Sequence, residues 1–257
     1  MQKTIQVYPI PALKDNYIWA IVDSNEAYVV DPGESAPVIA FLEANDVVLK
    51  GILITHHHGD HVQGIAELLN YRDVPVVGSH HSPLSGFTHR VHEGSEVKVT
   101  ERLPALQVLE IPGHTLDHIA FYTHGILFCG DTLFGAGCGR IFEGTGKMLY
   151  ASLQKIAQLP LETLICCAHE YTLLNLKFAH HVEPDNIVVN ERLMKTLKMY
   201  EQHQPSLPSS LLLEKQTNPF LRCDEPELKR AVEDFYGKKF ATAEEVFIAL
   251  RQWKDHF

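Results

Sequence analysis

The sequence predicts an α+β fold, a β-rich region with interspersed helices followed by a small all-helical domain. Short apolar segments separated by glycine-containing turns occupy the first part of the chain, and longer amphipathic segments with helix-capping signals occupy the rest. The 257 residues are 45% hydrophobic and 21% charged, as in an ordinary globular protein with a sizeable core. We expect the domains to be residues 1–170 and 171–257.

Eight segments of the first domain have the length and the β-branched or aromatic content of strands. Glycines mark the turns between them. The predicted strands are residues 17–22, 27–31, 51–55, 74–79, 106–111, 119–123, 126–129 and 163–168. Three helices are predicted among them, over residues 36–44, from Asp60 through Leu69, and over 147–158.

Three helices are predicted after residue 170. The first spans residues 190–203 and stops before Pro205, and the second has Pro226 in its first turn and Gly237 at its end. The last helix opens with a capping box formed by Thr242 and Glu245. Its apolar residues recur at i, i+3, i+4 and i+7 and form a core-facing stripe of Val246, Ala249, Leu250 and Trp253.

Composition excludes several classes of protein. The formal charge of −10 argues against a nucleic-acid binder, which would show a basic face. No apolar run approaches the roughly 20 residues of a membrane span, and residues 1–9 lack the apolar core of a secretory signal. The five cysteines follow no zinc-ribbon spacing and fit a reduced, cytoplasmic setting. We expect a monomer.

The most informative motif is Thr55-His56-His57-His58-Gly59-Asp60-His61, which directly follows a predicted buried strand. Alternation beyond the strand end puts His56 and His58 on one side and His57 on the other. Asp60 and His61 come around the turn. Two imidazoles, a carboxylate and a third imidazole in this arrangement can serve two adjacent metal ions.

Three further segments repeat one pattern, in which an apolar strand ends and a metal-binding side chain follows. These side chains are His114, Asp131 and His169. Strand ends are held rigidly and often face a cleft, so they suit a preorganised site. Each alone is weak, because a histidine or aspartate after a strand is usually a turn residue. Together with the histidine motif they predict a metal centre.

Imidazole and carboxylate ligands without thiolate suit zinc, iron or manganese. Two dications, two aspartates and one hydroxide sum to a charge of about +1, which attracts an anionic substrate. Two ions about 3.5–4 Å apart lower the pKa of a bridging water and polarise a carbonyl. The sixteen histidines also include nine for which we predict only solvated positions: His80, His81, His89, His92, His124, His180, His181, His203 and His256.

The histidine motif with its three later partners resembles the metallo-β-lactamase superfamily, and further motifs resemble the glyoxalase II, or hydroxyacylglutathione hydrolase, family. These motifs span nearly the whole chain. They are Asp15-Asn16-Tyr17, Asp31-Pro32-Gly33, Pro112-Gly113-His114-Thr115, Phe128-Cys129-Gly130-Asp131-Thr132-Leu133-Phe134, Gly137-Cys138-Gly139-Arg140, Ala168-His169-Glu170-Tyr171-Thr172 and Lys254-Asp255-His256-Phe257.

The resemblance implies an αββα sandwich that carries the metals and a helical C-terminal domain that helps bind glutathione. It implies two divalent ions per chain, with zinc favoured and iron or manganese as alternatives. The implied reaction is hydrolysis of a glutathione thioester, typically S-D-lactoylglutathione, as in methylglyoxal detoxification, by a bridging hydroxide that Asp60 and Asp131 help to hold. The implied ligands are His56, His58 and His114 for one metal, Asp60, His61 and His169 for the other, and Asp131 as the bridge.

By the same resemblance, glutathione is bound by Arg140, Phe142, Tyr171, Arg251 and Lys254. Glutathione carries two carboxylates, so an acidic protein needs local positive groups to receive it. Arg251 and Lys254 lie off the apolar stripe of the last helix, so we expect both to be available to solvent or ligand.

Three positions depart from the common family pattern. Gly59 stands where an aromatic residue or histidine is frequent, and Phe142 replaces a tyrosine that can hydrogen-bond the tripeptide. Asp117 replaces a frequent glycine. None removes a metal ligand. Asp31 either orients a metal-bound histidine or is only a turn residue.

Other functions remain open at this stage. The nearest is a glutathione-persulfide dioxygenase with one iron on the same fold. A lactonase or a transfer-RNA-processing nuclease explains Arg140 and the terminal cations less well. A non-catalytic metal-binding protein is the third alternative. One metal per chain would count against hydrolysis.

Overall fold

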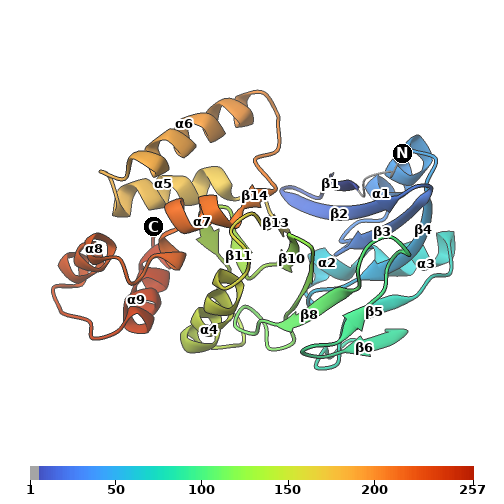
Figure 1. Ribbon diagram of the computed structural model, residues 1–257, viewed down its shortest axis with the longest axis horizontal. Helices are drawn as coiled ribbons and strands as arrows, with labels where there is room; N and C mark the ends of the chain where they lie inside the picture. The colour runs from blue at the N-terminus through green and yellow to red at the C-terminus, as the bar shows by residue number, and fades with distance from the viewer. Residues whose placement is uncertain (1–5) are drawn as a thin grey trace. The chain divides into compact units, whose positions relative to one another are not determined.

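A computed structural model (Figure 1) describes residues 6–257, which divide into two units. The first unit contains the described residues up to Glu110 together with Thr115–Gly130 and Cys166–His169, and the second contains Ile111–His114, Asp131–Ile165 and Glu170–Phe257. The predicted domain boundary at residue 170 stays a prediction. The segment predicted to lack a secretory signal, residues 1–9, lies partly outside the described residues.

The first unit contains a six-stranded sheet in the order β1-β2-β3-β4-β5-β6. The pairs from β1 to β3 are antiparallel and those from β3 to β6 are parallel. Its first strand was not predicted, because Pro9 and Pro11 interrupt the pattern and prolines are tolerated only at a sheet edge. The strands are β1 (Gln6–Ala12), β2 (Asn16–Asp23), β3 (Glu26–Val30), β4 (Val48–Leu53), β5 (Val76–Ser79) and β6 (His89–Val91).

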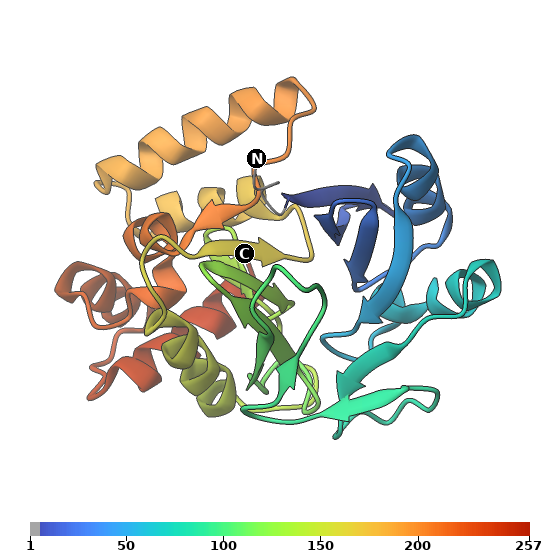
Figure 2. The same ribbon diagram turned by 45° about the vertical axis from the view of Figure 1, so that its right-hand side comes forward.

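Helices α1 (Ala36–Ala44) and α3 (Ile65–Tyr71) pack on one face of this sheet. Val38 and Leu42 from α1 and Leu68 from α3 are buried in one apolar cluster with side chains of β2, β3, β4 and β5. Each of these three side chains is at most 1% exposed, so the face is a closed core. Figure 2 shows these helices beside the blue and teal strands.

The predicted helix from Asp60 to Leu69 is wrong as a single element, because the chain forms a short helix α2 (Gly59–Val62) and then α3. The break falls at Gly64, where a β-carbon would lie 2.6 Å from the carbonyl oxygen of Pro32. The backbone at Pro32 therefore packs closely against Gly64, between the two helices. The local sequence pattern does not predict this contact.

The second sheet has the order β14-β13-β10-β9-β8-β7. Trp19 of β2 donates its indole N–H to the carbonyl oxygen of Cys167 at 2.9 Å, which joins the two sheets inside the first unit. The predicted strands here are all present within two residues. The strands are β7 (Glu96–Val97), β8 (Leu106–Glu110), β9 (Ile119–Thr123), β10 (Ile126–Gly130), β13 (Leu164–Cys167) and β14 (Ser209–Ser210).

The second unit is mainly helical, with a two-stranded hairpin. The four predicted helices are present, whereas α5, α7 and the short η1 were not predicted. Besides β14, its elements are β11 (Leu133–Phe134), β12 (Gly137–Cys138), α4 (Gly146–Ala157), α5 (Thr172–Val182), α6 (Ile187–Glu201), α7 (Leu211–Thr217), η1 (Pro219–Leu221), α8 (Pro226–Tyr236) and α9 (Ala243–Asp255).

The predicted helix signals at the C-terminal end are confirmed. Thr242 and Glu245 form the capping box of α9, and Gly237 ends α8 in a left-handed conformation with φ of 62°. The four stripe residues of α9 are all buried. The α+β class is therefore confirmed. Among the described helices, none has both the length and the apolar character that a membrane crossing requires.

Candidate metal centre

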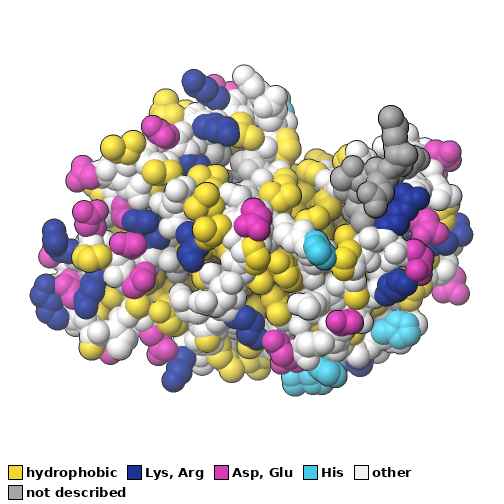
Figure 3. Space-filling view, viewed as in Figure 1, with side chains coloured by type: hydrophobic (Ala, Val, Ile, Leu, Met, Phe, Trp, Pro, Cys, Tyr) yellow, Lys and Arg dark blue, Asp and Glu magenta, His cyan; other side chains and the backbone are white. Residues whose placement is uncertain are grey.

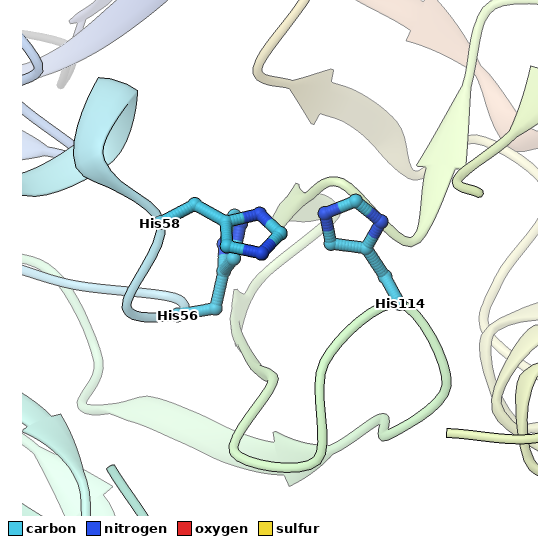
Figure 4. Close-up of side chains that lie close together, drawn as sticks. All are labelled: His56, His58 and His114. Atoms are coloured by element: carbon cyan, nitrogen blue, oxygen red, sulfur yellow. The ribbon is translucent and has the colours of Figure 1, made fainter. Parts of the chain in front are cut away.

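The histidine motif lies in the segment that joins β4 to α2 and in α2 itself. His56 is 1% exposed and His61 is fully buried, and the ring centroids of His56 and His58 lie 4.7 Å apart. Nδ1 of His57 lies 2.8 Å from Oδ1 of Asp117, outside the groups that contain His56 and His58. Figure 4 shows His56 and His58 leaving this segment, with His114 on a separate loop.

Two groups of predicted ligands have side-chain donor atoms that all lie within 4.8 Å of one another. The first is His56, His58 and His114, and the second is Asp60, His61 and His169. Asp131, the seventh predicted ligand, has Oδ2 at 3.4 Å from Nε2 of His114. The grouping matches the two ligand sets implied by the sequence resemblance.

Two histidines of the motif have a fixed ring orientation. Nδ1 of His61 lies 3.0 Å from Oδ2 of Asp31, and Nδ1 of His56 lies 3.1 Å from Oγ1 of Thr55. An imidazole held through Nδ1 directs Nε2 away from its partner, which is how proteins orient metal-binding histidines. These rings are therefore set to ligate through Nε2.

The two later histidines are held in the same way. Nδ1 of His169 lies 2.9 Å from Oδ1 of Asp15, and Nδ1 of His114 lies 2.7 Å from the carbonyl oxygen of Arg140. A carboxylate or carbonyl acceptor requires a proton on Nδ1, so Nε2 carries the lone pair that a metal needs. The sequence pattern had not indicated Asp15 or the Arg140 carbonyl for this purpose.

Distances between donor atoms fit metal coordination. Oδ2 of Asp60 lies 3.5 Å from Nε2 of His61 and 3.4 Å from Nε2 of His169. These separations are long for a hydrogen bond. They match the edge of a tetrahedron around zinc, which is about 3.4 Å for metal–ligand bonds of about 2.0–2.1 Å. The donor types and their spacing therefore fit a divalent transition metal.

Asp31 contacts two residues of the histidine motif, Thr55 and His61. Besides His61, it accepts hydrogen bonds from the backbone N–H of Thr55 at 2.7 Å and from the Thr55 hydroxyl at 2.6 Å. Its φ is +55°, a left-handed conformation that costs free energy for a residue with a side chain. Of the two roles left open by the sequence, the structure confirms that Asp31 orients a predicted metal ligand.

Close backbone packing also fixes the segments that carry the two aspartates. A β-carbon on Gly33 would lie 1.8 Å from the carbonyl oxygen of Asp60, and one on Gly139 would lie 2.0 Å from that of Asp131. Only glycine permits such an approach. Larger residues at these positions would displace a predicted ligand.

Two residues near the centre were missed by the sequence analysis. The ring of His118 stacks on that of His56 at 4.6 Å with an interplanar angle of 16°. Asn16 donates its side-chain amide to Oδ2 of Asp60 at 3.0 Å. Sequence position alone carried no signal for His118, whereas Asn16 belongs to a motif already noted for its resemblance.

The structure brings the three predicted glutathione-binding cations, Arg140, Arg251 and Lys254, together in the second unit. Arg251 donates to Oδ1 of Asp255 at 3.1 Å, and Nε of Arg140 lies 3.9 Å from the same oxygen. The Arg140 side chain is 70% exposed. The Arg140 guanidinium is therefore available to a ligand.

The expectation that Arg251 is available to solvent is wrong. Arg251 is 4% exposed, and its guanidinium donates to the carbonyl oxygen of Cys138 at 3.0 Å and lies 5.0 Å from the ring centre of Phe220. The prediction rested on the apolar stripe of α9 alone. Residues of η1 and β12 pack against the neighbouring face of this helix as well.

Lys254 is partly buried, with its ammonium 5.0 Å from the ring centre of Phe178. Burial, together with the positive charges of Arg251 and Arg140, lowers the pKa of Lys254 to about 8. An ammonium in this state gains more than an exposed one when a carboxylate arrives, because the new partner compensates the lost hydration.

The two aromatic residues predicted to contact glutathione occupy different surroundings. Phe142 is 64% exposed, and its ring meets the edge of His114 at 5.2 Å. Tyr171 packs edge-to-face against Phe134 at 5.3 Å, at the start of α5. Phe142 is therefore an apolar surface beside one predicted metal ligand.

The hairpin loop between Asp131 and Arg140 is held by side chains from two helices and a connecting segment. Glu214 accepts the backbone N–H of Ala136 at 2.8 Å, and Asn218 donates to the carbonyl oxygen of Gly137 at 2.9 Å. Asn175 donates to the carbonyl oxygen of Gly135 at 3.0 Å. Glu214 is fully buried and paired with Arg192 at 2.6 Å.

Comparison with known proteins agrees with this fold and donor set. The Metallo-beta-lactamase superfamily matches residues 13–169, more than half of the chain. The chain belongs to this superfamily, and it carries a divalent-metal site made of imidazole and carboxylate groups.

Within the superfamily, the chain belongs to the hydroxyacylglutathione hydrolases. The family's C-terminal region, "Hydroxyacylglutathione hydrolase C-terminus", matches residues 170–257. A hydroxyacylglutathione hydrolase of Nitrosomonas eutropha is 45% identical over 98% of this chain and 99% of its own length. One of Pectobacterium atrosepticum is 47% identical over 96% and 98% of the two chains.

Solved structures with the same fold include ETHE1 from Myxococcus xanthus, at 25% identity and a TM-score of 0.68 over 97% of this chain and 90% of that chain. TTHA1623 in a di-iron-bound form matches at 25% identity and a TM-score of 0.61, covering 84% of this chain and 100% of that one. The metallo-β-lactamase fold expected from the sequence is confirmed.

Proposed function

We propose that this chain hydrolyses thioesters of glutathione with 2-hydroxy acids, S-D-lactoylglutathione above all, to glutathione and the free acid. The observation that carries the proposal is the pair of three-residue donor groups, within 4.8 Å in each case, in a member of the hydroxyacylglutathione hydrolases. The substrate class follows from the name of the relatives that are 45–47% identical over nearly their whole length.

The proposed ligand assignment has His56, His58 and His114 holding one ion and Asp60, His61 and His169 holding the other, with Asp131 between the two ions. Its support is the donor spacing together with the orientation of four imidazoles through Nδ1. Zinc is the proposed metal, because neutral imidazole and carboxylate at tetrahedral spacing suit it. Iron is the first alternative, and TTHA1623 in its di-iron-bound form lends that alternative support.

When bound, two such ions supply a hydroxide nucleophile at neutral pH and polarise the thioester carbonyl. The protein's own contribution is to hold the donor atoms rigidly and to offset positive charge with Asp60 and Asp131. Hydrolysis of the thioester forms a bond between an oxygen from water and the acyl carbon and breaks the carbon–sulfur bond. The glutathione thiolate leaves with the electron pair. No side chain of the protein needs to become a covalent nucleophile.

The proposed glutathione site lies in the second unit, where Arg140 and Lys254 offer positive charge. Arg140 is exposed, and Lys254 has a depressed pKa that a carboxylate partner would restore. Phe142 offers an exposed ring, and Tyr171 a phenol at the start of α5. Arg251 is buried, so its proposed role is to support the loop around Cys138 and to add positive charge near Lys254.

Two lesser proposals concern the setting of the enzyme. A reduced, cytoplasmic location is supported by the five cysteines, all of which are buried thiols that form no disulfide bond in the described part of the chain. The monomeric state expected from the sequence stays a prediction.

The test is steady-state hydrolysis of S-D-lactoylglutathione, with metal content measured on the same sample. We expect two ions per chain and release of glutathione together with lactate. One ion per chain with oxygen-dependent consumption of glutathione persulfide would favour the dioxygenase instead. Two bound ions without thioester turnover would contradict the proposal and favour a protein that only binds metal.

A further inference from the structure

A second group of metal-binding side chains lies in the first unit, outside the centre described above. His80, His81 and Glu110 place their donor atoms within 4.8 Å of one another. Nδ1 of His80 lies 3.7 Å from Oε1 of Glu110, and Nε2 of His81 lies 3.8 Å from the same oxygen. Their side chains are 41%, 54% and 28% exposed, so an ion in solution can reach them.

The segment that carries the two histidines is preorganised by Arg90. Its guanidinium donates to the carbonyl oxygen of Ser82 at 3.0 Å and to that of Leu84. The backbone N–H of His81 also donates to the Ser79 hydroxyl at 3.2 Å. The imidazole rings of His80 and His81 lie 3.7 Å apart, centre to centre. The two rings are therefore held side by side before any ion binds.

Glu110 and His92 are fixed on the other side of the group. The backbone N–H of Glu93 donates to Oε1 of Glu110 at 3.2 Å, and the backbone N–H of Glu110 donates to Oε2 of Glu93. The ring centre of His92 lies 5.9 Å from that of His80. Nδ1 of His92 donates to the carbonyl oxygen of Glu93 at 2.9 Å, which leaves its Nε2 as the nitrogen able to accept a metal.

The two histidines of this group and the start of the histidine motif both follow the carboxyl ends of neighbouring parallel strands. β4 and β5 are parallel neighbours, with Leu53 opposite Val77. His56 follows the end of β4, and His80 follows the end of β5 directly. The carboxyl ends of parallel neighbouring strands lie at one edge of a sheet. Figure 3 shows exposed histidine side chains near β6, the next strand along.

We propose that His80, His81 and Glu110 form a separate, peripheral site for a divalent transition ion such as zinc, with His92 within reach as a fourth ligand. Two or three imidazoles with one carboxylate suit zinc, copper or nickel and not calcium or magnesium. Nδ1 of His80 lies 3.4 Å from the carbonyl oxygen of Val91, a contact that an ion bound at this nitrogen would replace. Oε1 of Glu110 lies 3.7 Å from Nδ1 of His80 and 3.8 Å from Nε2 of His81, a few tenths of an ångström beyond the tetrahedral edge of about 3.4 Å. Exposed side chains can move by that much, and Glu110 and Glu93 supply negative charge.

The experiment is equilibrium dialysis of the metal-loaded full-length protein against increasing free zinc, with bound metal counted per chain. We expect wild type to bind one more zinc ion than His80→Ala/His81→Ala, whatever number the histidine-motif centre holds. Glu110→Gln, which keeps the shape and the acceptor oxygen, should weaken the additional ion at least tenfold. Thioester turnover in all variants should stay within twofold of wild type, because none of these residues is a proposed ligand of the reaction centre.

His124→Asn is the matched control. His124 is an exposed histidine at a left-handed turn position that asparagine tolerates, and it should leave the extra ion in place. Equal zinc content in wild type and in the double variant would overturn the proposal. So would the absence of any additional ion in wild type at 100-fold molar excess of zinc. Loss of the ion in the control as well would assign the binding to scattered surface histidines instead.

Discussion

Asp31 shows how much of the metal centre depends on one residue that touches no metal in the proposed assignment. It joins the backbone of Thr55, the hydroxyl of Thr55 and the ring of His61, and it does so from a left-handed backbone conformation. A fixed hydrogen-bond partner raises the basicity of a ligating imidazole and sets its orientation. The strain at Asp31 is thus tied to the site it supports.

Replacement of Asp31 by asparagine should therefore lower metal affinity and thioester turnover by about 10- to 100-fold. Asparagine tolerates the positive φ, so the change removes the negative charge without new backbone strain. Metal content after dialysis and kcat/KM at limiting zinc measure the effect. Asp46→Asn is the control, because Asp46 is exposed with φ of +51°. Equal losses in both variants would show that the backbone, and not the contact with His61, is responsible.

Lys254 predicts a pH dependence for substrate capture. Burial and neighbouring arginines lower its pKa to about 8, so it is protonated at pH 7 and mostly neutral at pH 9. If it receives a carboxylate of glutathione, kcat/KM falls as pH rises through 8. We expect a fall of up to about tenfold between pH 7 and 9.

Lys254→Arg should flatten that profile, because an arginine stays charged throughout this range. Initial rates at low substrate concentration over pH 6.5–9.5 measure both curves, since kcat/KM reports the free enzyme. Superimposable profiles for wild type and Lys254→Arg would remove Lys254 from the glutathione site.

At the scale of elements, the hairpin of β11 and β12 is the part whose conformation depends most on its surroundings. Consecutive backbone groups from Phe134 to Gly137 bond to Asn218, Asn175 and Glu214. This loop connects a proposed metal ligand, Asp131, to a proposed substrate contact, Arg140. The buried Glu214 also neutralises Arg192, which is 6% exposed.

Glu214→Gln should destabilise the protein by up to about 3 kcal/mol, because Arg192 loses its buried counter-charge. It should also raise KM for the thioester severalfold, because the loop that carries Arg140 loses its anchor. Chemical denaturation and steady-state kinetics give the two numbers. Glu183→Gln is the matched control, since Glu183 is a buried partner of Arg222 at 2.9 Å. It should lower stability without moving KM; an equal rise in KM would argue against a specific role for the loop.

Elements with strong local signals were predicted more accurately than elements whose form depends on distant contacts. Strands such as Ile119–Thr123 and helices such as Pro226–Tyr236 were predicted within two residues, because apolar periodicity and caps are local signals. β1 was missed because its prolines are acceptable only at a sheet edge. The helix broken at Gly64 was missed because the cause is a contact with a distant backbone segment.

For the whole molecule, metal binding and folding stability should be linked. Donors from positions 56 to 169 must converge to bind an ion, and the unfolded chain offers no such arrangement. Chelation of the metal should lower the unfolding temperature, and at free zinc 1,000 times its dissociation constant each ion stabilises by about 4 kcal/mol. Differential scanning calorimetry with chelator, and after zinc is restored, measures the difference.

Asp131→Ala provides the comparison for this effect. In the proposed assignment Asp131 lies between the ions, so the variant should bind metal poorly and respond little to chelator. Wild type with the same unfolding temperature in the presence and absence of chelator would contradict the link. A variant that keeps two ions and normal turnover would contradict the assignment of Asp131.

The sequence by itself determined the α+β class and the identities of all seven proposed ligands. Each proposed ligand follows a strand or lies in one compact motif. Such positions can be predicted from local sequence patterns, because they depend on residues that are close in the sequence. Only the tertiary structure decided which groups orient those ligands, because His61 and Asp31 are 30 positions apart and His169 and Asp15 are 154 apart.

Tertiary packing likewise decided that Arg251 is buried and that His80, His81 and Glu110 meet at one place on the surface. Burial of a helix face depends on every element that packs against it, and the encounter of two strand ends depends on sheet order. Neither is encoded in the spacing of the residues concerned. The sequence therefore showed which metal-binding and charged side chains are available. Only the tertiary structure showed which residues each of them contacts.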